Sequence, residues 1–205
     1  MKVAVVGGTG DFGLALAQRL AAAGEHVVIG SRDAERARAK AVEAGAAAGA
    51  ANADAVSGVD IVVLAVKADA ALSTAADLVD AIGDTPVLSV ASELRFTKTG
   101  AYPTEEQRSV AERTQELLRA PVVAGLHSLA AASLAHGKAD GDALVCGDDE
   151  HAKELALALA GKVVAGRALD AGPLASARAL EGMTAVIVNL NRRYRGHAGV
   201  RIVGL

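Results

Sequence analysis

The opening stretch of the chain is the feature that most constrains its fold. An apolar run, Val3–Val6, leads into a glycine cluster, and a helical pattern begins directly after it. Gly8, Gly10 and Gly13 have the G-x-G-x-x-G spacing of a tight turn that lets a pyrophosphate approach bare backbone and lets helix and strand pack closely. The following helix offers its positive end to the phosphates. This context predicts a dinucleotide site; the alternative is a glycine-rich turn without a ligand.

The end of the second expected strand, 26–30, predicts which dinucleotide binds. NAD sites usually carry Asp or Glu there, to bind the ribose 2′-hydroxyl. This chain has Ser31 and Arg32 instead, with Arg36 one helical turn further on. Guanidinium groups match the oxygens of a 2′-phosphate, so the pattern favours NADP. The alternative is that both arginines are solvated surface charges, and Asp33 is expected to cap the next helix.

Apolar runs of strand type alternate with helical patterns along most of the chain. We therefore expect an α/β fold, a Rossmann-type doubly wound and mainly parallel sheet with a small C-terminal helical extension. A dinucleotide-binding domain over 1–140 would precede an extension over 141–205, or the two would be continuous. Two connections are expected, a featureless one over 45–57 and a long loop over 92–103, and a Thr104–Gln107 capping box is expected to open the following helix.

Polar residues follow two of the expected buried strands at their carboxyl ends, where such sheets bind ligands. Lys67, Ala68 and Asp69 follow the strand over 59–66, and they either touch the nicotinamide-side ribose or are plain loop residues. His127 follows the strand over 121–126. It either faces a ligand or is a histidine satisfied by backbone at a strand end.

Composition excludes several classes of function. The net charge of -3 indicates no general attraction to nucleic acid or to a membrane surface. A single cysteine, Cys146, permits no intrachain disulfide and suits a reducing cytoplasm. No apolar run reaches the roughly 18 residues of a membrane span. The histidines show no metal-ligand spacing with cysteine or carboxylates, so no metal site is expected.

The last expected helix, 174–194, has an apolar middle, Met183–Asn191, that covers more than one of its faces. A helix of that kind needs burial from two sides, so we expect subunit contact in a homodimer. Four arginines follow in the most basic part of the chain: Arg192, Arg193, Arg195 and Arg201. Arg192 and Arg193 also suit the negative end of this helix, which leaves two interpretations of the patch open.

Several longer motifs then identify a family. They are Gly7–Gly13, Gly30–Arg32, Ala124–His127, Val145–Asp149, Leu169–Leu174 and the ending Gly199–Leu205. Together these stretches span most of the chain, which resembles the F420-dependent NADP reductases. Cys-Gly-Asp-Asp and Asp-Ala-Gly-Pro-Leu are far more specific than the glycine fingerprint.

The resemblance implies hydride transfer between carbon 4 of the nicotinamide of NADP(H) and carbon 5 of the 5-deazaflavin coenzyme F420. It also implies a set of cofactor contacts, with His127 and Leu129 by the deazaflavin and Ala131 near the nicotinamide. We expect His127 to orient the deazaflavin by donating a hydrogen bond. The basic patch could meet the anionic F420 tail, or Arg192 and Arg193 could only complement the negative end of the last helix. The NADP-side contacts expected from motif and resemblance are Gly8, Thr9, Gly10, Asp11, Phe12, Ser31, Arg32, Arg36, Lys67 and Ala68.

Other functions remain open at this point. The chain could be another NADPH-dependent reductase acting on imines or ketones, for which Lys67 or His127 would be the donor acid. It could serve a flavin or ferric acceptor, or be a non-catalytic NADPH-sensing protein. Fold alone does not choose among these; the motifs favour the F420 enzyme.

Overall fold

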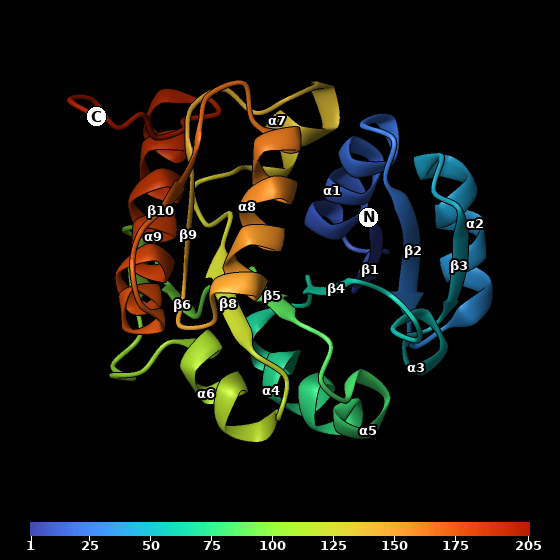
Figure 1. The fold of residues 1–205 in the computed structure, drawn as a ribbon. Helices are drawn as coiled ribbons and strands as arrows, with labels where there is room; N and C mark the ends of the chain where they lie inside the picture. The colour runs from blue at the N-terminus through green and yellow to red at the C-terminus, as the bar shows by residue number, and fades with distance from the viewer.

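The structure is a computed structural model that describes residues 1–205. Eight strands form one sheet, and helices cover both of its faces (Figure 1). In chain order the strands of this sheet are β1 (Lys2–Val6), β2 (His26–Ser31), β3 (Ala48–Ala51), β4 (Ile61–Leu64), β5 (Val87–Ser89), β8 (Val122–Gly125), β9 (Ala143–Gly147) and β10 (Ala168–Asp170).

The strands lie in the spatial order β10-β9-β8-β5-β4-β1-β2-β3. β1 pairs in parallel with both β2 and β4, so the connection reverses direction between β1 and β4, which is where doubly wound sheets bind ligands. Only β9 runs antiparallel to its neighbour β8, and β10 is parallel to β9. The expected mainly parallel, Rossmann-type sheet is therefore confirmed, and the segment after 140 adds its last two strands.

The helices divide between the two faces of the sheet. They are α1 (Asp11–Ala22), α2 (Ala34–Ala44), α3 (Asn52–Ala55), α4 (Ala68–Asp77), α5 (Val79–Ile82), α6 (Val110–Leu117), α7 (Ala131–His136), α8 (Glu150–Val163), the 3-10 turn η1 (Leu174–Ser176) and α9 (Ala177–Tyr194). α1, α2, α7 and α8 pack on one face and α4, α5, α6 and α9 on the other. In Figure 1, α4, α5 and α6 lie along the bottom of the view and α9 along its left side.

Alternation along the strands builds a separate apolar core on each face. Val3 and Val5 of β1 point to the α1 side, whereas Ala4 and Val6 point to the α4 side. The side chains of β4 are all buried, as expected for a parallel strand covered on both faces. Because the cores consist almost entirely of Ala, Val, Leu and Ile, the helices approach the sheet closely.

Two connections expected to be irregular contain regular structure. The stretch 45–57 includes β3 and α3, and Gly49 packs directly against the backbone of α2 at Ala37. Its Ala/Gly composition carries no hydrophobic periodicity, which is why the expectation of a featureless connection was wrong. The loop expected over 92–103 contains an antiparallel hairpin, β6 (Leu94–Phe96) and β7 (Ala101–Pro103).

Of the two helix caps predicted from the sequence, one is confirmed and the other is wrong. Asp33 caps α2 by accepting hydrogen bonds from the backbone N–H groups of Glu35 and Arg36, as expected. The capping box of α6 is formed by Ser109 and Glu112, not by Thr104 and Gln107. Ser109 is three residues before Glu112, the same spacing as Thr104 and Gln107, and it lies nearer the apolar residues of the helix. The sequence therefore contained two possible capping boxes.

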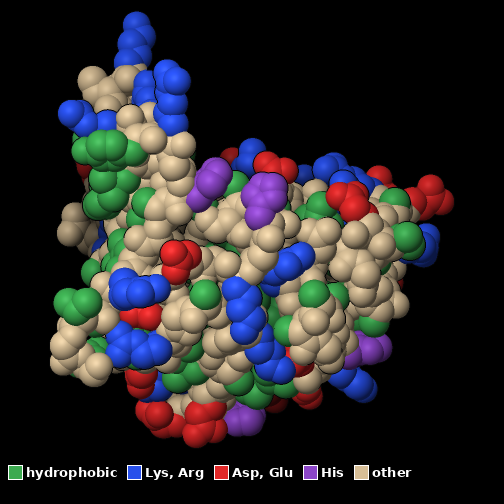
Figure 2. Space-filling view, turned by 90° about the horizontal axis from the view of Figure 1, so that it is seen from above, with side chains coloured by type: hydrophobic (Ala, Val, Ile, Leu, Met, Phe, Trp, Pro, Cys, Tyr) green, Lys and Arg blue, Asp and Glu red, His purple; other side chains and the backbone are tan.

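Basic residues gather where α9 ends and the C-terminal tail begins. Arg192 donates to the Lys98 carbonyl, Arg193 lies over the Tyr194 ring, and Arg201 pairs with Asp140. Figure 2 shows basic side chains clustered on a projection at the left of the view, the side on which α9 and the C-terminus lie in Figure 1. No helix of the chain has the length and apolar character required to cross a bilayer.

A buried carboxyl joins α6 to α9. Glu181 is 1% exposed, and its Oε1 accepts hydrogen bonds from the N–H groups of Val110 (2.7 Å) and Ala111 (3.4 Å) at the start of α6. Its Oε2 is buried without a partner. Burial raises the pKa of Glu181 to about 7, against the opposing effect of these bonds and of Arg178 and Arg113. The folded protein therefore favours the protonated carboxyl.

This pKa gives a stability prediction for Glu181→Gln. In the wild type, the stabilisation from proton binding is full below pH 4.5 and is lost as the pH rises through about 7. Gln does not titrate, so the variant should gain roughly 2 kcal/mol relative to wild type between pH 4.5 and 8. Urea unfolding at both pH values measures this, with the exposed Glu154→Gln as the control. Parallel pH dependence in wild type and Glu181→Gln would contradict the prediction.

Candidate functional site

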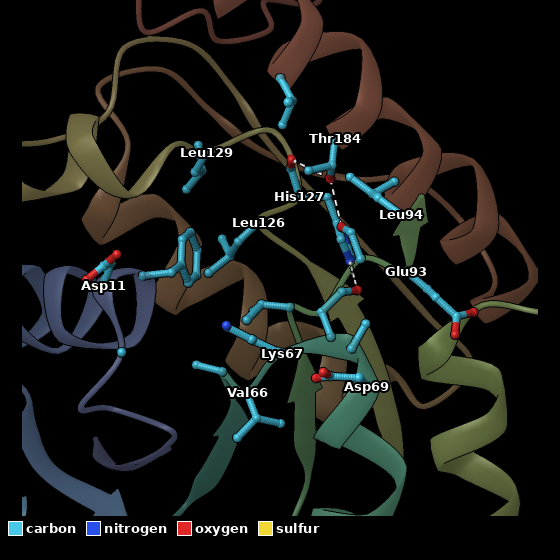
Figure 3. A pocket seen from close by; sticks show the side chains of 18 of the residues that line it. Asp11, Val66, Lys67, Asp69, Glu93, Leu94, Leu126, His127, Leu129 and Thr184 are labelled. Carbon is cyan, nitrogen blue, oxygen red and sulfur yellow. Dashed lines mark hydrogen bonds between the residues drawn. The ribbon is translucent and has the colours of Figure 1, made fainter. Parts of the chain in front are cut away.

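A pocket of about 940 Å³ lies along one edge of the sheet, at the carboxyl ends of four parallel strands. All four of these strand ends contribute lining residues: 10–12 after β1, 65–69 after β4, 90–96 after β5, and 126, 127 and 129 after β8. Thr184 and Val188 of α9 and Thr104 complete the wall. Figure 3 shows Asp11 on one side of the pocket and Glu93, Leu94 and Thr184 on the other.

The glycines of the β1–α1 turn have different physical reasons for being glycine. Gly7 has φ +81°, and a Cβ on Gly13 would lie 2.5 Å from the Gly7 carbonyl oxygen. A Cβ on Gly8 would lie 2.8 Å from the Val5 carbonyl oxygen. Gly10 is different, because the nearest atom to a Cβ there is 3.5 Å away and its φ is an ordinary -85°. The open space beside Gly10 fits a pyrophosphate at the start of α1.

The residues expected to select NADP lie together beyond the glycine turn, outside the main pocket. Ser31 is buried at the end of β2, and its Oγ accepts a hydrogen bond from Asp33 N–H. Arg36 reaches back from α2, with its Nη2 3.5 Å from the Thr9 carbonyl oxygen. Arg32 and Arg36 are exposed and form no ion pair within the chain. Neither guanidinium charge is therefore neutralised by a carboxylate of the chain.

His127 lies at the pocket wall and is almost fully buried. Its Nε2 is 3.2 Å from the Ala91 carbonyl oxygen, which can only accept, so Nε2 carries the proton and Nδ1 is bare. Nδ1 is buried and has no partner. Burial lowers the pKa of His127 to about 4, so the ring is neutral at physiological pH. The expected donation to a ligand is therefore not available in this conformation, because the only ring N–H of His127 is bound to the Ala91 carbonyl.

The backbone around His127 is strained and is held by two hydrogen bonds. Leu126 has φ +66°, a left-handed conformation that costs a non-glycine residue about 1 kcal/mol. Thr184 Oγ1 donates to the His127 carbonyl (3.0 Å) and lies 2.8 Å from Ser92 Oγ. Ser128 Oγ donates to the Asp142 carbonyl (3.0 Å). Strain that persists at a pocket wall under such restraint is typical of functional sites.

The structure brings most predicted site residues to the pocket and leaves some outside it. Asp11, Phe12, Lys67, Ala68, His127 and Leu129 line it, as does Gly10. Gly8 and Thr9 form the turn beside it, and Ala131 opens α7 without lining it. The expectations missed Ser92, Leu94, Thr184 and Val188. Thr184 is a lone hydroxyl in the apolar middle of the last helix, and that contrast was the available signal.

The pocket contains no activated nucleophile. Cys146 is fully buried in β9 away from the pocket, and burial raises its pKa to about 12, so it stays a thiol. The lining is largely apolar, with the phosphate-type turn at one end and the neutral His127 at the other. Such a surface is suited to holding flat rings out of water beside an anchored dinucleotide.

The fold and the glycine turn define the chain as a Rossmann-type dinucleotide-binding protein. The model of the family "NADP oxidoreductase coenzyme F420-dependent" matches residues 2–93. An F420-dependent NADP reductase from Methanothermobacter thermautotrophicus is 39% identical, over 100% of this chain and 96% of that protein. The chain belongs to the F420-dependent NADP reductase family.

Solved structures agree with this assignment. A protein of Arthrobacter sp. FB24 assigned to the F420-dependent NADP reductases superposes with a TM-score of 0.80 at 27% identity, over 100% of this chain and 99% of that one. An imine reductase from Streptomyces aurantiacus has a TM-score of 0.65 at 22% identity, over 95% of this chain and 62% of its own. At that identity, the second likeness shows the shared fold alone.

The contrast between Gly10 and Gly13 predicts two different defects. Gly13→Ala should destabilise the fold, because overpacking against the Gly7 carbonyl costs about 1–3 kcal/mol. Gly10→Ala should keep near-wild-type stability and bind NADPH more weakly, on the order of tenfold. Thermal unfolding and NADPH fluorescence titration measure the two effects. Unchanged NADPH affinity in a folded Gly10→Ala variant would contradict the assignment of the open space.

Proposed function

We propose that this chain is an oxidoreductase that transfers a hydride between NADP(H) and coenzyme F420. The observation that carries the proposal is the pocket itself, which begins at the glycine turn and extends across four strand ends to α9. A volume of about 940 Å³ is at the upper end for a single small ligand and accommodates two ring systems. The family to which the chain belongs supports both cosubstrates.

On the NADP side, backbone and guanidinium groups would do the binding. Gly8, Thr9 and Gly10 would receive the pyrophosphate at the start of α1, with Asp11 and Phe12 next to it. Ser31, Arg32 and Arg36 would hold the 2′-phosphate through a hydroxyl donor and two cations that no carboxylate of the chain occupies. Lys67 and Ala68 after β4 would contact the nicotinamide-side ribose, with Ala131 near the nicotinamide.

On the acceptor side, His127 and Leu129 would contact the deazaflavin. The neutral His127 would orient the deazaflavin by packing against it, while Nε2 stays bound to the Ala91 carbonyl. When bound together, the two cosubstrates supply the redox chemistry, a hydride leaving carbon 4 of the nicotinamide for carbon 5 of the deazaflavin. The protein contributes orientation and an apolar wall, including Leu126 and Val66, that excludes water.

The proposal assigns the two cosubstrates to different segments of the chain. Residues 1–140 would supply the dinucleotide site, and residues 141–205 would complete the acceptor side through α9. The imine reductase interpretation is less well supported, because it needs a proton donor in the pocket and the pKa of His127 is too low to serve. Of the two donors named from the sequence, only Lys67 remains for that alternative.

Absorbance of oxidised F420 tests the proposal directly. We expect NADPH, and not NADH, to bleach F420 in the presence of the protein. Arg32→Ala should raise the KM for NADPH about tenfold or more, because a charge-assisted bond to phosphate is lost. Arg38→Ala, an exposed arginine two positions beyond Arg36, is the matched control. No bleaching with either nucleotide would reject the enzyme, and equal rates with both would reject the role of Ser31 and Arg32.

We also propose that the protein is a homodimer that uses the outer face of α9. Val186, Leu190 and Tyr194 follow one another at four-residue spacing and are 58%, 40% and 71% exposed. An apolar stripe of this kind on a helix that also lines the pocket suits burial against a second copy. Assembly there would brace the helix from which Thr184 holds the His127 loop.

The dimer has its own test. Leu190→Glu places a charge in the middle of the stripe and should convert the dimer to monomer, as measured by light scattering coupled to size exclusion. Glu154→Gln on the exposed side of α8 is the control and should stay dimeric. A wild-type protein that is monomeric at tens of micromolar would contradict the proposal.

A further inference from the structure

The hairpin β6–β7 forms the pocket wall opposite the glycine turn, and α9 holds it in place. Leu94, Arg95 and Phe96 of β6 line the pocket. Behind them, β7 lies against α9 at Asn189. Figure 3 shows Leu94 beside α9 and across the pocket from Asp11. The position of this wall therefore depends on contacts made away from the pocket itself.

The side chain of Asn189 makes two hydrogen bonds to one residue of the hairpin, Ala101. Its Oδ1 accepts a hydrogen bond from Ala101 N–H at 2.8 Å, and its Nδ2 donates to the Ala101 carbonyl at 2.8 Å. A side-chain amide pairing with both backbone groups imitates the pairing of a neighbouring β-strand. It provides hydrogen-bond partners for backbone groups at an edge of the two-stranded sheet, where no other strand lies beside them.

The residues around this contact are consistent with its role. A Cβ on Gly100 would lie 2.5 Å from Asn189 Oδ1, so the glycine makes room for the amide. One turn further along α9, Arg192 Nη2 donates to the Lys98 carbonyl at 3.1 Å in the hairpin loop. At the base of the hairpin, Arg178 Nη2 donates to the Thr104 carbonyl at 2.8 Å. Three side chains of one helix thus bind the backbone of the hairpin.

We propose that Asn189 is a positioning residue for the acceptor side of the pocket, one that sets affinity for the deazaflavin by fixing the hairpin wall. The inference rests on the proposed function, since it assigns the end of the pocket away from the glycine turn to F420. Asn189 itself does not line the pocket, so its effect passes through Leu94, Arg95 and Phe96. The dinucleotide side, built on the β1–α1 turn and β2, is independent of the hairpin.

Equilibrium binding and hydrogen exchange of the full chain test this proposal. Asn189→Ala and the isosteric Asn189→Asp, which keeps the acceptor and loses the donor, are compared with wild type. Backbone amides of residues 94–102 should exchange faster in both variants. The Kd for oxidised F420, from quenching of its fluorescence, should rise on the order of tenfold. The Kd for NADPH should stay within about twofold.

The matched control is Asn191→Ala, which removes the same side chain two positions further along α9. The Asn191 amide accepts from Ala198 N–H in the C-terminal tail instead of from the hairpin. Its F420 affinity and hairpin exchange should equal those of wild type.

Three results would overturn the proposal. Unchanged F420 affinity in a variant whose hairpin amides exchange faster would show that the hairpin does not affect binding of the acceptor. Equal losses of F420 and NADPH affinity would make Asn189 a general structural residue. Wild-type F420 affinity in Asn189→Asp would refute the need for both bonds. A wild-type protein that binds NADPH but no F420 would instead refute the proposed function. The wild-type measurement separates this outcome from a failure of the Asn189 proposal before any variant is made.

Discussion

Three glycines in the turn between β1 and α1 leave no room for side chains, and the rest of the site depends on that close approach. Gly7 needs its positive φ, and Gly8 and Gly13 would place a Cβ within 2.9 Å of neighbouring backbone. The start of α1 therefore lies directly over the end of β1. Gly10, with open space beside it, is the N-cap of α1, where the positive end of the helix dipole can meet an anion.

From this turn the pocket is assembled by sheet topology. Because β1, β4, β5 and β8 are parallel neighbours, their carboxyl ends deliver four segments to one edge. The final helix returns from the far end of the sequence and closes the other side with Thr184, Val188 and, through the hairpin, Asn189. The pocket has no activated nucleophile and its histidine is neutral, which agrees with a reaction that needs orientation and exclusion of water more than acid or base.

The sequence predicted what local spacing and periodicity determine. The glycine turn, the Asp33 cap, the mainly parallel sheet and the place of His127 at a strand end follow from short patterns. What it could not predict depends on contacts distant in sequence. The hairpin is held by α9, some ninety residues away, and the tautomer of His127 is fixed by the Ala91 carbonyl. The contacts of the site residues with bound cosubstrates remain predictions.

The central claim is that NADPH and F420 meet in this one pocket and exchange hydride directly. Single turnover with NADPH carrying deuterium at both hydrogen positions of carbon 4, in ordinary water, tests it most directly. Direct transfer across a dry pocket predicts that the reduced deazaflavin carries the deuterium at carbon 5. Reduced deazaflavin that carries only solvent hydrogen at that carbon would contradict the account.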